Sequence, residues 1–413
     1  MLKLLLGGSG SGKTTLLYQR IRARAEAGEK SILLVPEQFT SSTEGRIHRE
    51  LGDALSGLVE SFSFTSLAEH ILSAEGGSAV QTLSDAGRAV LVRRALEELQ
   101  DNVHYYYRHR RSAAFCQMAA ETIDELKSAG LSGQQLYELA QDCGTDSAKL
   151  SELALIFQGY ETLLAGTGMD PSDRLELAAS RLEAALARGE LPEFLRDRAV
   201  FIDEFDTFNA PKKRLMGALL ASLPTVTVAL CDDGTPLVQG DMSLFSGAKQ
   251  VAAQLRQLAR RNGTDVAVPE LLRRDMRHAD APGLAAAAQL LAAGRCDPPT
   301  ACPEIKLFAA PSREEEARAA AAAIRRLMRQ GVRCGKVAVV CRDISKYRAA
   351  VKYEFRMADI PLYCDEPTTP EFSAPATAVR CLLALARGAE LTEQLTTLAK
   401  TGLCALTEEE VCA

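Results

Sequence analysis

Apolar residues recur along this chain in two patterns, and each pattern predicts a different secondary-structure element. Short apolar runs at residues 2–6 and 31–35 end at a glycine-rich loop and at a proline, which is typical of strands buried in a parallel sheet. Between these runs, residues 13–27 predict a helix that ends at a glycine. A strand, a loop, a helix and a second strand in this order predict a βαβ unit and therefore a parallel sheet.

The spacing of apolar residues changes in the middle of the chain. From about residue 84 to residue 188, Leu, Ala, Glu, Arg and Lys dominate, and the apolar positions recur at helical spacing without a strand pattern. Helices are expected at residues 85–99, 115–129, 151–165 and 174–187. We therefore expect an all-helical subdomain at residues 81–195, inserted into an α/β domain that begins with residues 1–80.

Strand-like runs return after this insertion. Residues 199–202 and 226–230 are apolar, and acidic residues follow each run closely. Because such runs are typical of strands buried in a sheet, the α/β domain is expected to resume over residues 196–297.

A group of prolines, Pro298, Pro299 and Pro303, marks a linker after this domain. The alternation of strands and helices then begins again, with strands expected at residues 305–309 and 336–341 and helices at residues 313–330 and 344–357. This pattern has no glycine-rich loop of its own, and the last residues still have helical spacing. We interpret residues 298–413 as the truncated start of a second α/β domain.

The sequence Gly-Gly-Ser-Gly-Ser-Gly-Lys-Thr at residues 7–14 matches the phosphate-binding pattern G-x-x-x-x-G-K-[ST] at a strand–helix junction. Glycines let the backbone N–H groups converge on phosphate oxygens, and the helix N-terminus adds partial positive charge. Lys13 is expected to contact the β- and γ-phosphates as a catalytic residue, and Thr14 to ligate magnesium. The residues expected to bind the nucleotide, which we take to be ATP with Mg²⁺, are Gly7, Gly8, Ser9, Gly10, Ser11, Gly12, Lys13, Thr14 and Thr15.

A second candidate site follows the apolar run at residues 199–202, where two carboxylates, Asp203 and Glu204, end the strand. Asp203 is expected to hold magnesium, and Glu204 to orient or deprotonate an attacking water. The alternative is a strand that ends in a solvated acidic turn; the presence of the P-loop favours the metal site. About 190 residues separate Lys13 from Asp203, which leaves room for a helical subdomain that a small nucleoside kinase lacks.

With these motifs, the chain resembles the N-terminal part of the B subunit of the bacterial AddAB-type ATP-dependent helicase–nuclease. The resemblance rests on the P-loop near the N-terminus, on Leu-Val-Pro-Glu-Gln-Phe-Thr at residues 34–40 and on Ser-Phe-Ser-Phe at residues 61–64 with Leu67. It also rests on Phe205 and Phe208 after the acidic strand end, and on Ile-Pro-Leu-Tyr-Cys-Asp at residues 360–365. The resemblance spans essentially all 413 residues.

The resemblance implies the fold of UvrD-like superfamily 1 helicases. This fold is a P-loop NTPase (RecA-like) parallel sheet with an inserted all-helical subdomain and a second RecA-like α/β domain, here incomplete. The resemblance also implies a role in processing double-strand DNA ends for recombinational repair, with DNA and the A subunit of the helicase–nuclease as partners. The nuclease carboxylates and iron–sulfur cysteines of the family lie beyond residue 413, so the iron–sulfur cluster is expected only in the full-length family.

Residues 272–278 (Leu-Arg-Arg-Asp-Met-Arg-His) partly resemble the helicase pattern Leu-x-x-Asn-Tyr-Arg-Ser. This implies that Arg277 points at the γ-phosphate as a further catalytic residue; the alternative is an ordinary charged helix end. Other helicase features are missing, because no glutamine segment precedes the P-loop and no clear Gly-Asp-x-x-Gln sensor follows Cys231, although Asp233 or Gln239 could replace it. These departures argue against a complete translocating motor in this chain.

A cluster of aromatic and basic residues lies at residues 104–111, within the expected helical insertion. Interleaved rings and guanidinium groups can stack on bases and hold the phosphates of single-stranded DNA. The expected DNA contacts are Tyr105, Tyr107, Arg108, Arg110 and Arg111. The alternative is a solvated turn whose tyrosines pack inward.

Composition narrows the classes of function further. The net charge of −6 argues against non-specific wrapping of nucleic acid, although a local basic channel stays compatible with it. The 11 cysteines include no C-x-x-C pair, which argues against a zinc ribbon and indicates reduced thiols in the cytoplasm. No apolar run reaches the roughly 18 residues that a membrane span requires, so no membrane association is expected.

Three functions are compatible with these observations. The first is the ATP-binding, helicase-like part of a DNA helicase–exonuclease subunit. The second is a scaffold module that binds nucleotide or DNA without hydrolysis. The third is an unrelated P-loop kinase or ATPase, against which the large helical insertion counts.

Overall fold

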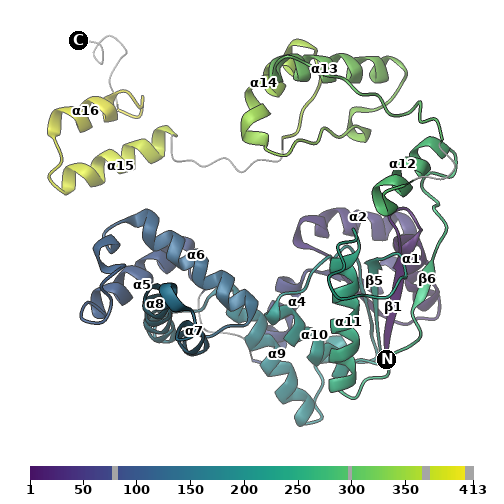
Figure 1. Ribbon diagram of the computed structural model, residues 1–413, viewed down its shortest axis with the longest axis horizontal. Helices are drawn as coiled ribbons and strands as arrows, with labels where there is room; N and C mark the ends of the chain where they lie inside the picture. Colours follow the sequence, from purple (N-terminus) through teal and green to yellow (C-terminus); the bar gives the residue numbers. More distant parts are fainter. Residues whose placement is uncertain (77–81, 296–299, 365–372, 405–413) are drawn as a thin grey trace. The chain divides into compact units, whose positions relative to one another are not determined.

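The computed structural model describes residues 1–76, 82–295, 300–364 and 373–404. The chain divides into two compact units, Met1–Ile305 and Lys306–Ala413 (Figure 1). The expected linker residues Pro298 and Pro299 lie outside the described residues, as does the helical pattern expected at the C-terminal end. The expected domain limits at residues 80, 195 and 297 stay predictions.

A six-stranded parallel sheet forms the centre of the first unit, with the strand order β3-β2-β4-β5-β1-β6. The strands are β1 (Leu2–Gly7), β2 (Ser31–Leu34), β3 (Val59–Phe62), β4 (Ala199–Ile202), β5 (Thr225–Cys231) and β6 (Glu270–Leu272). The four strands expected from apolar runs, and the α/β fold with a parallel sheet, are confirmed. The sequence pattern did not predict β3, which contains polar residues, or β6, which has only three residues.

Helices cover both faces of the sheet. Successive residues of a strand point to opposite faces, so each strand contributes side chains to two cores. Leu4, Ile32 and Val200 contribute to the core on one face, together with side chains of α4, α9, α10 and α11. On the other face, Leu5 and Leu33 pack with side chains of α1 and α2. These helices are α1 (Lys13–Glu26), α2 (Thr40–Leu51), α4 (Phe64–Ala74), α9 (Pro171–Ala187), α10 (Ala210–Ser222) and α11 (Ser246–Arg261), with the short α3 (Asp53–Ser56) after α2.

A second core of the first unit consists of helices only. It is formed by α5 (Asp85–Glu98), α6 (Ala113–Ala129), α7 (Gly133–Ala140) and α8 (Ser147–Ala165). Its fully buried side chains include Val92, Leu96, Ile156 and Phe157. All four helices expected in the middle of the chain are confirmed, and α7 is an addition. The last of the four expected helices, α9, packs against α4 and α10 in the sheet's core.

Capping residues mark the ends of the helices in this core. The hydroxyls of Ser84, Ser112 and Ser132 each accept a hydrogen bond from the backbone N–H three residues later, at the start of α5, α6 and α7. Gly130 ends α6 in the left-handed conformation, at φ 83°. Among the residues that the structure describes, no helix combines the length and apolar composition needed to cross a membrane.

The second unit corrects one expectation. It contains α13 (Arg313–Arg329), α14 (Ile344–Met357), α15 (Ala374–Ala386) and α16 (Leu391–Ala399), whereas α12 (Pro282–Ala293) belongs to the first unit. The strands expected at residues 305–309 and 336–341 are wrong, because neither segment is a strand. Leu307 and Val340 are 97% and 91% exposed, and no paired strand lies in the described part of this unit. The expected βαβ arrangement is therefore absent from its described residues.

Candidate nucleotide site

The P-loop connects the carboxyl end of β1 to the first turn of α1, and glycines determine its shape. Gly10 and Gly12 adopt φ values of 80° and 88°, a left-handed region that disfavours side chains. A Cβ atom on Gly10 would also lie 2.7 Å from the Cβ of Arg277. Glycine at position 10 therefore serves both the curl of the loop and the close approach of a distant segment.

The side chain of Lys13 folds back over this loop. Its Nζ donates hydrogen bonds to the backbone oxygens of Gly7 and Gly8, each at 2.8 Å. Burial lowers the pKa of Lys13 below its ordinary value, while the charges of Cys231 and Asp203 act in the opposite direction. The ammonium group therefore lies at the mouth of the loop, where the phosphate-binding pattern requires it.

Ser11 provides a test of whether this loop suits a phosphate group. Its Oγ atom is buried and makes no hydrogen bond to any described residue. A buried hydroxyl without a partner is costly, so such groups mark places where a ligand completes the bonding. The loop's curl, the lysine and this hydroxyl together suit the oxygens of a nucleotide.

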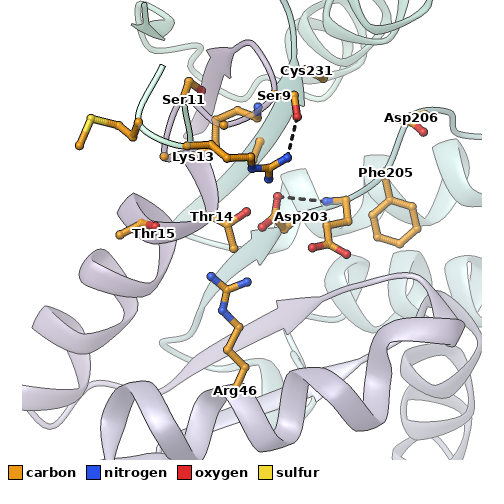
Figure 2. A pocket seen from close by; sticks show the side chains of 16 residues that line it. Ser9, Ser11, Lys13, Thr14, Thr15, Arg46, Asp203, Phe205, Asp206 and Cys231 are labelled. Atoms are coloured by element: carbon orange, nitrogen blue, oxygen red, sulfur yellow. Dashed lines mark hydrogen bonds between the residues drawn. The ribbon is translucent and has the colours of Figure 1, made fainter. Parts of the chain in front are cut away.

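Asp203 lies directly after β4, and its carboxylate meets the start of α1. The Thr14 side chain lies beside the Asp203 carboxylate (Figure 2), and the backbone N–H of Glu204 donates to Asp203 Oδ1 at 3.0 Å. Burial raises the pKa of Asp203, although the nearby Thr14 hydroxyl, the Glu204 N–H and the charge of Lys13 partly oppose this. The two expected magnesium ligands, Thr14 and Asp203, are therefore adjacent, although 189 positions separate them in the sequence. Oxygen ligands of this kind suit Mg²⁺.

Glu204 has an unusual backbone conformation for a residue with a side chain. Its φ is 64°, in the left-handed region, which carries an energetic cost that functional sites often retain. Burial and the neighbouring Asp203 raise the pKa of Glu204, whereas Arg46 lowers it. Asp203 is only 6% exposed, whereas Glu204 is exposed, so burial contradicts the alternative of a solvated acidic turn for Asp203 and not for Glu204.

Residues 275–278, which follow β6 in the sequence, make hydrogen bonds to the P-loop. The backbone N–H groups of Met276 and Arg277 donate to Gly10 O at 2.9 and 3.2 Å, and Arg277 Nη1 donates to Ser9 Oγ at 3.2 Å. Asp275 Oδ1 accepts from the backbone N–H of Arg277, which fixes the turn. The alternative of a charged helix end is wrong, because these residues are not helical and α12 begins at Pro282.

These elements surround one cavity of about 550 Å³, a size that suits a small-molecule ligand (Figure 2). It is lined by residues 9–15, Arg46, residues 203–206, Ala229, Cys231, Met276 and Arg277. Sequence reasoning missed Arg46, which comes from α2. The helical spacing of the buried residues Thr43, Ile47 and Leu51 puts Arg46 beside the covered face of α2, but nothing in the sequence directs it to the P-loop.

The sensor candidates after β5 have other partners. Asp233 Oδ1 accepts hydrogen bonds from Thr235 and lies 3.2 Å from the Nζ of the buried Lys249, which also contacts Asp241. Neither Asp233 nor Gln239 lines the nucleotide cavity; Cys231 does. The β5–α11 loop is thus held to α11 by a buried lysine.

The basic–aromatic cluster lies at the surface of the all-helical core, and its residues do not line the cavity at the P-loop. Arg110 lies over the Tyr107 ring at 3.9 Å and Arg108 over the Tyr105 ring at 5.6 Å. The Glu152 carboxylate accepts backbone hydrogen bonds from residues 104–106 and so fixes the turn. Tyr105, Arg108 and Arg111 are exposed, whereas Tyr106 and Tyr107 are half-buried, so two rings of the cluster pack partly inward.

Comparisons with known proteins identify a family. The family model described as "ADDB, N-terminal" matches residues 4–286. The B subunit of the ATP-dependent helicase/deoxyribonuclease of Moorella thermoacetica is 32% identical over 379 residues, and that of Desulforudis audaxviator is 33% identical over 378 residues. Each alignment covers 88% of this chain and 32% of the relative. The chain therefore spans about a third of the length of these relatives.

Proposed function

This chain belongs to the family of AddB N-terminal regions, and from this membership we propose that it is the ATP-binding, helicase-like part of a DNA helicase–exonuclease subunit. Its role would lie in double-strand break repair and recombination. The observation that carries the proposal is the adjacency of the P-loop and Asp203, which line one cavity with Thr14 beside Asp203. This adjacency supports a RecA-like P-loop NTPase arrangement, and family membership excludes an unrelated kinase.

The P-loop, Asp203, Glu204 and Arg277 have distinct roles in this proposal. The backbone of residues 7–12, with Ser11 and Lys13, would hold the phosphates of ATP. Thr14 and Asp203 would hold Mg²⁺, which neutralises phosphate oxygens when bound. Glu204 would orient or deprotonate the attacking water, and Arg277, which is bonded to the loop through Ser9, would contact the γ-phosphate.

DNA and a partner protein are further parts of the proposal. The exposed residues of the basic–aromatic cluster, with Arg110 and Tyr107, would contact single-stranded DNA by stacking and by charge. The relatives are named as B subunits, which supports an A subunit as heterodimer partner. We place this work in the cytoplasm, where the DNA and the free thiols of this chain would both be found.

A second candidate function is a module that binds ATP without hydrolysing it. The observation that favours it is the use of Asp233 in the Lys249 contacts, which leaves the loop after β5 without an acidic sensor at the cavity. In that case, the bound nucleotide would stabilise the loop and the segment at residues 275–278 for assembly. Turnover distinguishes the two candidates.

The experiment measures binding of a fluorescent ATP analogue with Mg²⁺ and then ATP hydrolysis with and without single-stranded DNA. Lys13→Ala is expected to weaken binding about tenfold or more, since a charge-assisted contact is worth about 1.5–3 kcal/mol. Lys30→Ala, which removes an exposed lysine, is the matched control and leaves binding unchanged. Failure of the wild-type chain to bind ATP would overturn the proposal, while binding without DNA-stimulated turnover would favour the second candidate.

A further inference from the structure

A pocket with aromatic walls opens where the turn at residues 104–111 meets the start of α6. Its volume is about 390 Å³, and it is lined by Tyr105, Tyr106, His109, Ala114, Phe115 and Met118. None of these residues lines the cavity at the P-loop. Tyr105 and Met118 are 43% and 56% exposed, so apolar surface stays open to solvent here. Exposed apolar side chains that gather around a pocket mark a binding site.

The walls of this aromatic pocket are held in place by one another and by the backbone. The centroids of the Tyr106 and His109 rings each lie 5.5 Å from that of Phe115, and the Tyr105 ring meets Tyr106 edge to face at 4.9 Å. The Glu152 carboxylate accepts hydrogen bonds from the backbone N–H groups of residues 104–106 and so fixes the chain that carries two of these rings. A pocket that is formed in advance loses little conformational entropy when a ligand binds.

Positive charge lies at the rim of the aromatic pocket. The Arg108 guanidinium lies 5.6 Å and the Lys149 ammonium 5.5 Å from the centroid of the Tyr105 ring. The turn itself contains three arginines and no acidic residue. The acidic residues beside it have partners, because Glu152 is bonded to the backbone of the turn and Asp146 lies 3.6 Å from Lys149 in an exposed ion pair. The rim therefore complements a polyanion, and the rings below it complement a flat apolar group.

We propose that the aromatic pocket binds one unstacked base of single-stranded DNA, while Arg108 and Lys149 hold the neighbouring phosphates. The inference rests on the proposed contact between the basic–aromatic cluster and DNA, and it adds a pocket for a base to that contact. Every nucleobase has a flat face that stacks on aromatic rings, so the pocket accepts any base. In duplex DNA the bases are paired and stacked, so the pocket favours a single strand. An apolar side chain of a protein would also fill the pocket, but it would leave the two cations unused.

The test measures the affinity of the full chain for a fluorescent thymine oligonucleotide and for an abasic strand of the same length. Tyr105→Ala is expected to weaken binding of the thymine strand about fivefold or more, with binding of the abasic strand changed by less than about twofold. Ala114→Leu fills the pocket from an exposed position and is expected to cause the same selective loss without removing a ring. The matched control is Tyr137→Ala, which removes a tyrosine of similar exposure from α7 and changes neither affinity.

A strand that carries one 2-aminopurine reports stacking directly, because stacking on a ring quenches the fluorescence of this base. The wild-type chain is expected to quench it, and Ala114→Leu is not. Equal losses for the thymine and abasic strands in Tyr105→Ala would overturn the inference and leave the proposed function standing, since only the backbone would then be bound. Unchanged binding in both variants would overturn it as well and assign the pocket to a protein side chain. If the wild-type chain binds ATP but neither strand, the inference fails together with the DNA contacts of the proposed function, while its ATP-binding part stands.

Discussion

The two units of this chain contain similar apolar runs that have different structures. In the first unit, β2 lies between β3 and β4, and all four of its residues are buried. In the second unit, the runs at residues 305–309 and 336–341 contain equally apolar residues, yet Leu307 and Val340 are almost fully exposed. An apolar run is thus a strand only where neighbouring strands accept its backbone hydrogen bonds and a helix covers its side chains.

Hydrogen exchange gives the largest expected difference between the two kinds of segment. Amides of β2 and β4 exchange only when the unit opens, so their protection is expected to exceed roughly 10³-fold. Amides of residues 306–309 and 338–341 make no ladder hydrogen bonds and are expected to exchange near the rates of free peptides. Exchange measured by mass spectrometry checks this, and comparable protection in both groups would remove the contrast.

Substitution by alanine of one buried and one exposed side chain tests this difference between the two units at single residues. Ile32→Ala, in the centre of β2, is expected to lower the free energy of unfolding by about 2–5 kcal/mol, because it leaves a cavity in the packed core. Leu307→Ala is expected to change it by less than about 0.5 kcal/mol. Urea unfolding followed by circular dichroism measures both, and equal losses would show that residues 306–309 are packed after all.

A polar contact joins the all-helical core to α9. Its removal shows how much a buried ion pair contributes to the free energy of unfolding, compared with the apolar packing of Ile32. Lys127 Nζ lies 2.8 Å from Asp170 and 2.7 Å from Asp173, and Tyr160 donates a hydrogen bond to Asp170. Lys127→Met leaves Asp170 buried with one partner fewer and is expected to cost about 2 kcal/mol.

The matched control for this variant is Arg93→Met, which breaks an exposed ion pair with Glu97. Its expected cost is about 0.5 kcal/mol or less. Urea unfolding compares the two variants under the same conditions. If both cost the same, the Lys127 contacts do not stabilise the joint between the two cores.

The smallest expected effect concerns the nucleotide site itself. Burial raises the pKa of Asp203 in the folded state, so its ionised form is penalised there relative to the unfolded chain. This penalty is absent where Asp203 is protonated in both states and grows as pH rises through and above the ordinary Asp pKa. Asp203→Asn is therefore expected to stabilise the chain by about 1 kcal/mol near pH 7, with a smaller gain toward pH 4. Thermal unfolding at several pH values measures it, with exposed Asp206→Asn as the control; a gain that grows in acid would contradict the sign.

Sequence patterns predicted most of the first unit, and the reasons for the misses are physical. Buried strands such as β4 are continuous apolar runs, whereas β3 has two polar residues between its apolar ends and β6 depends on pairing with β1 over three residues. The P-loop and Asp203 were predictable because the carboxyl ends of parallel strands meet at one edge. Arg46 was not, because its place depends on how α2 packs on the sheet. The apolar runs of the second unit led to wrong strand predictions. The spacing of apolar residues in a sequence does not show whether a neighbouring strand is available for pairing.

The strand order also determines when the proposed nucleotide site can form. β1 is made first, but its neighbours in the sheet are β5 and β6, which end at residues 231 and 272. The P-loop is bonded to Arg277, still later in synthesis. During translation β1 therefore waits, unpaired and apolar, until β5, which begins at Thr225, has been made. Sequence-distant pairing of this kind slows folding, so capture of ATP by a nascent chain would report that the whole sheet has closed.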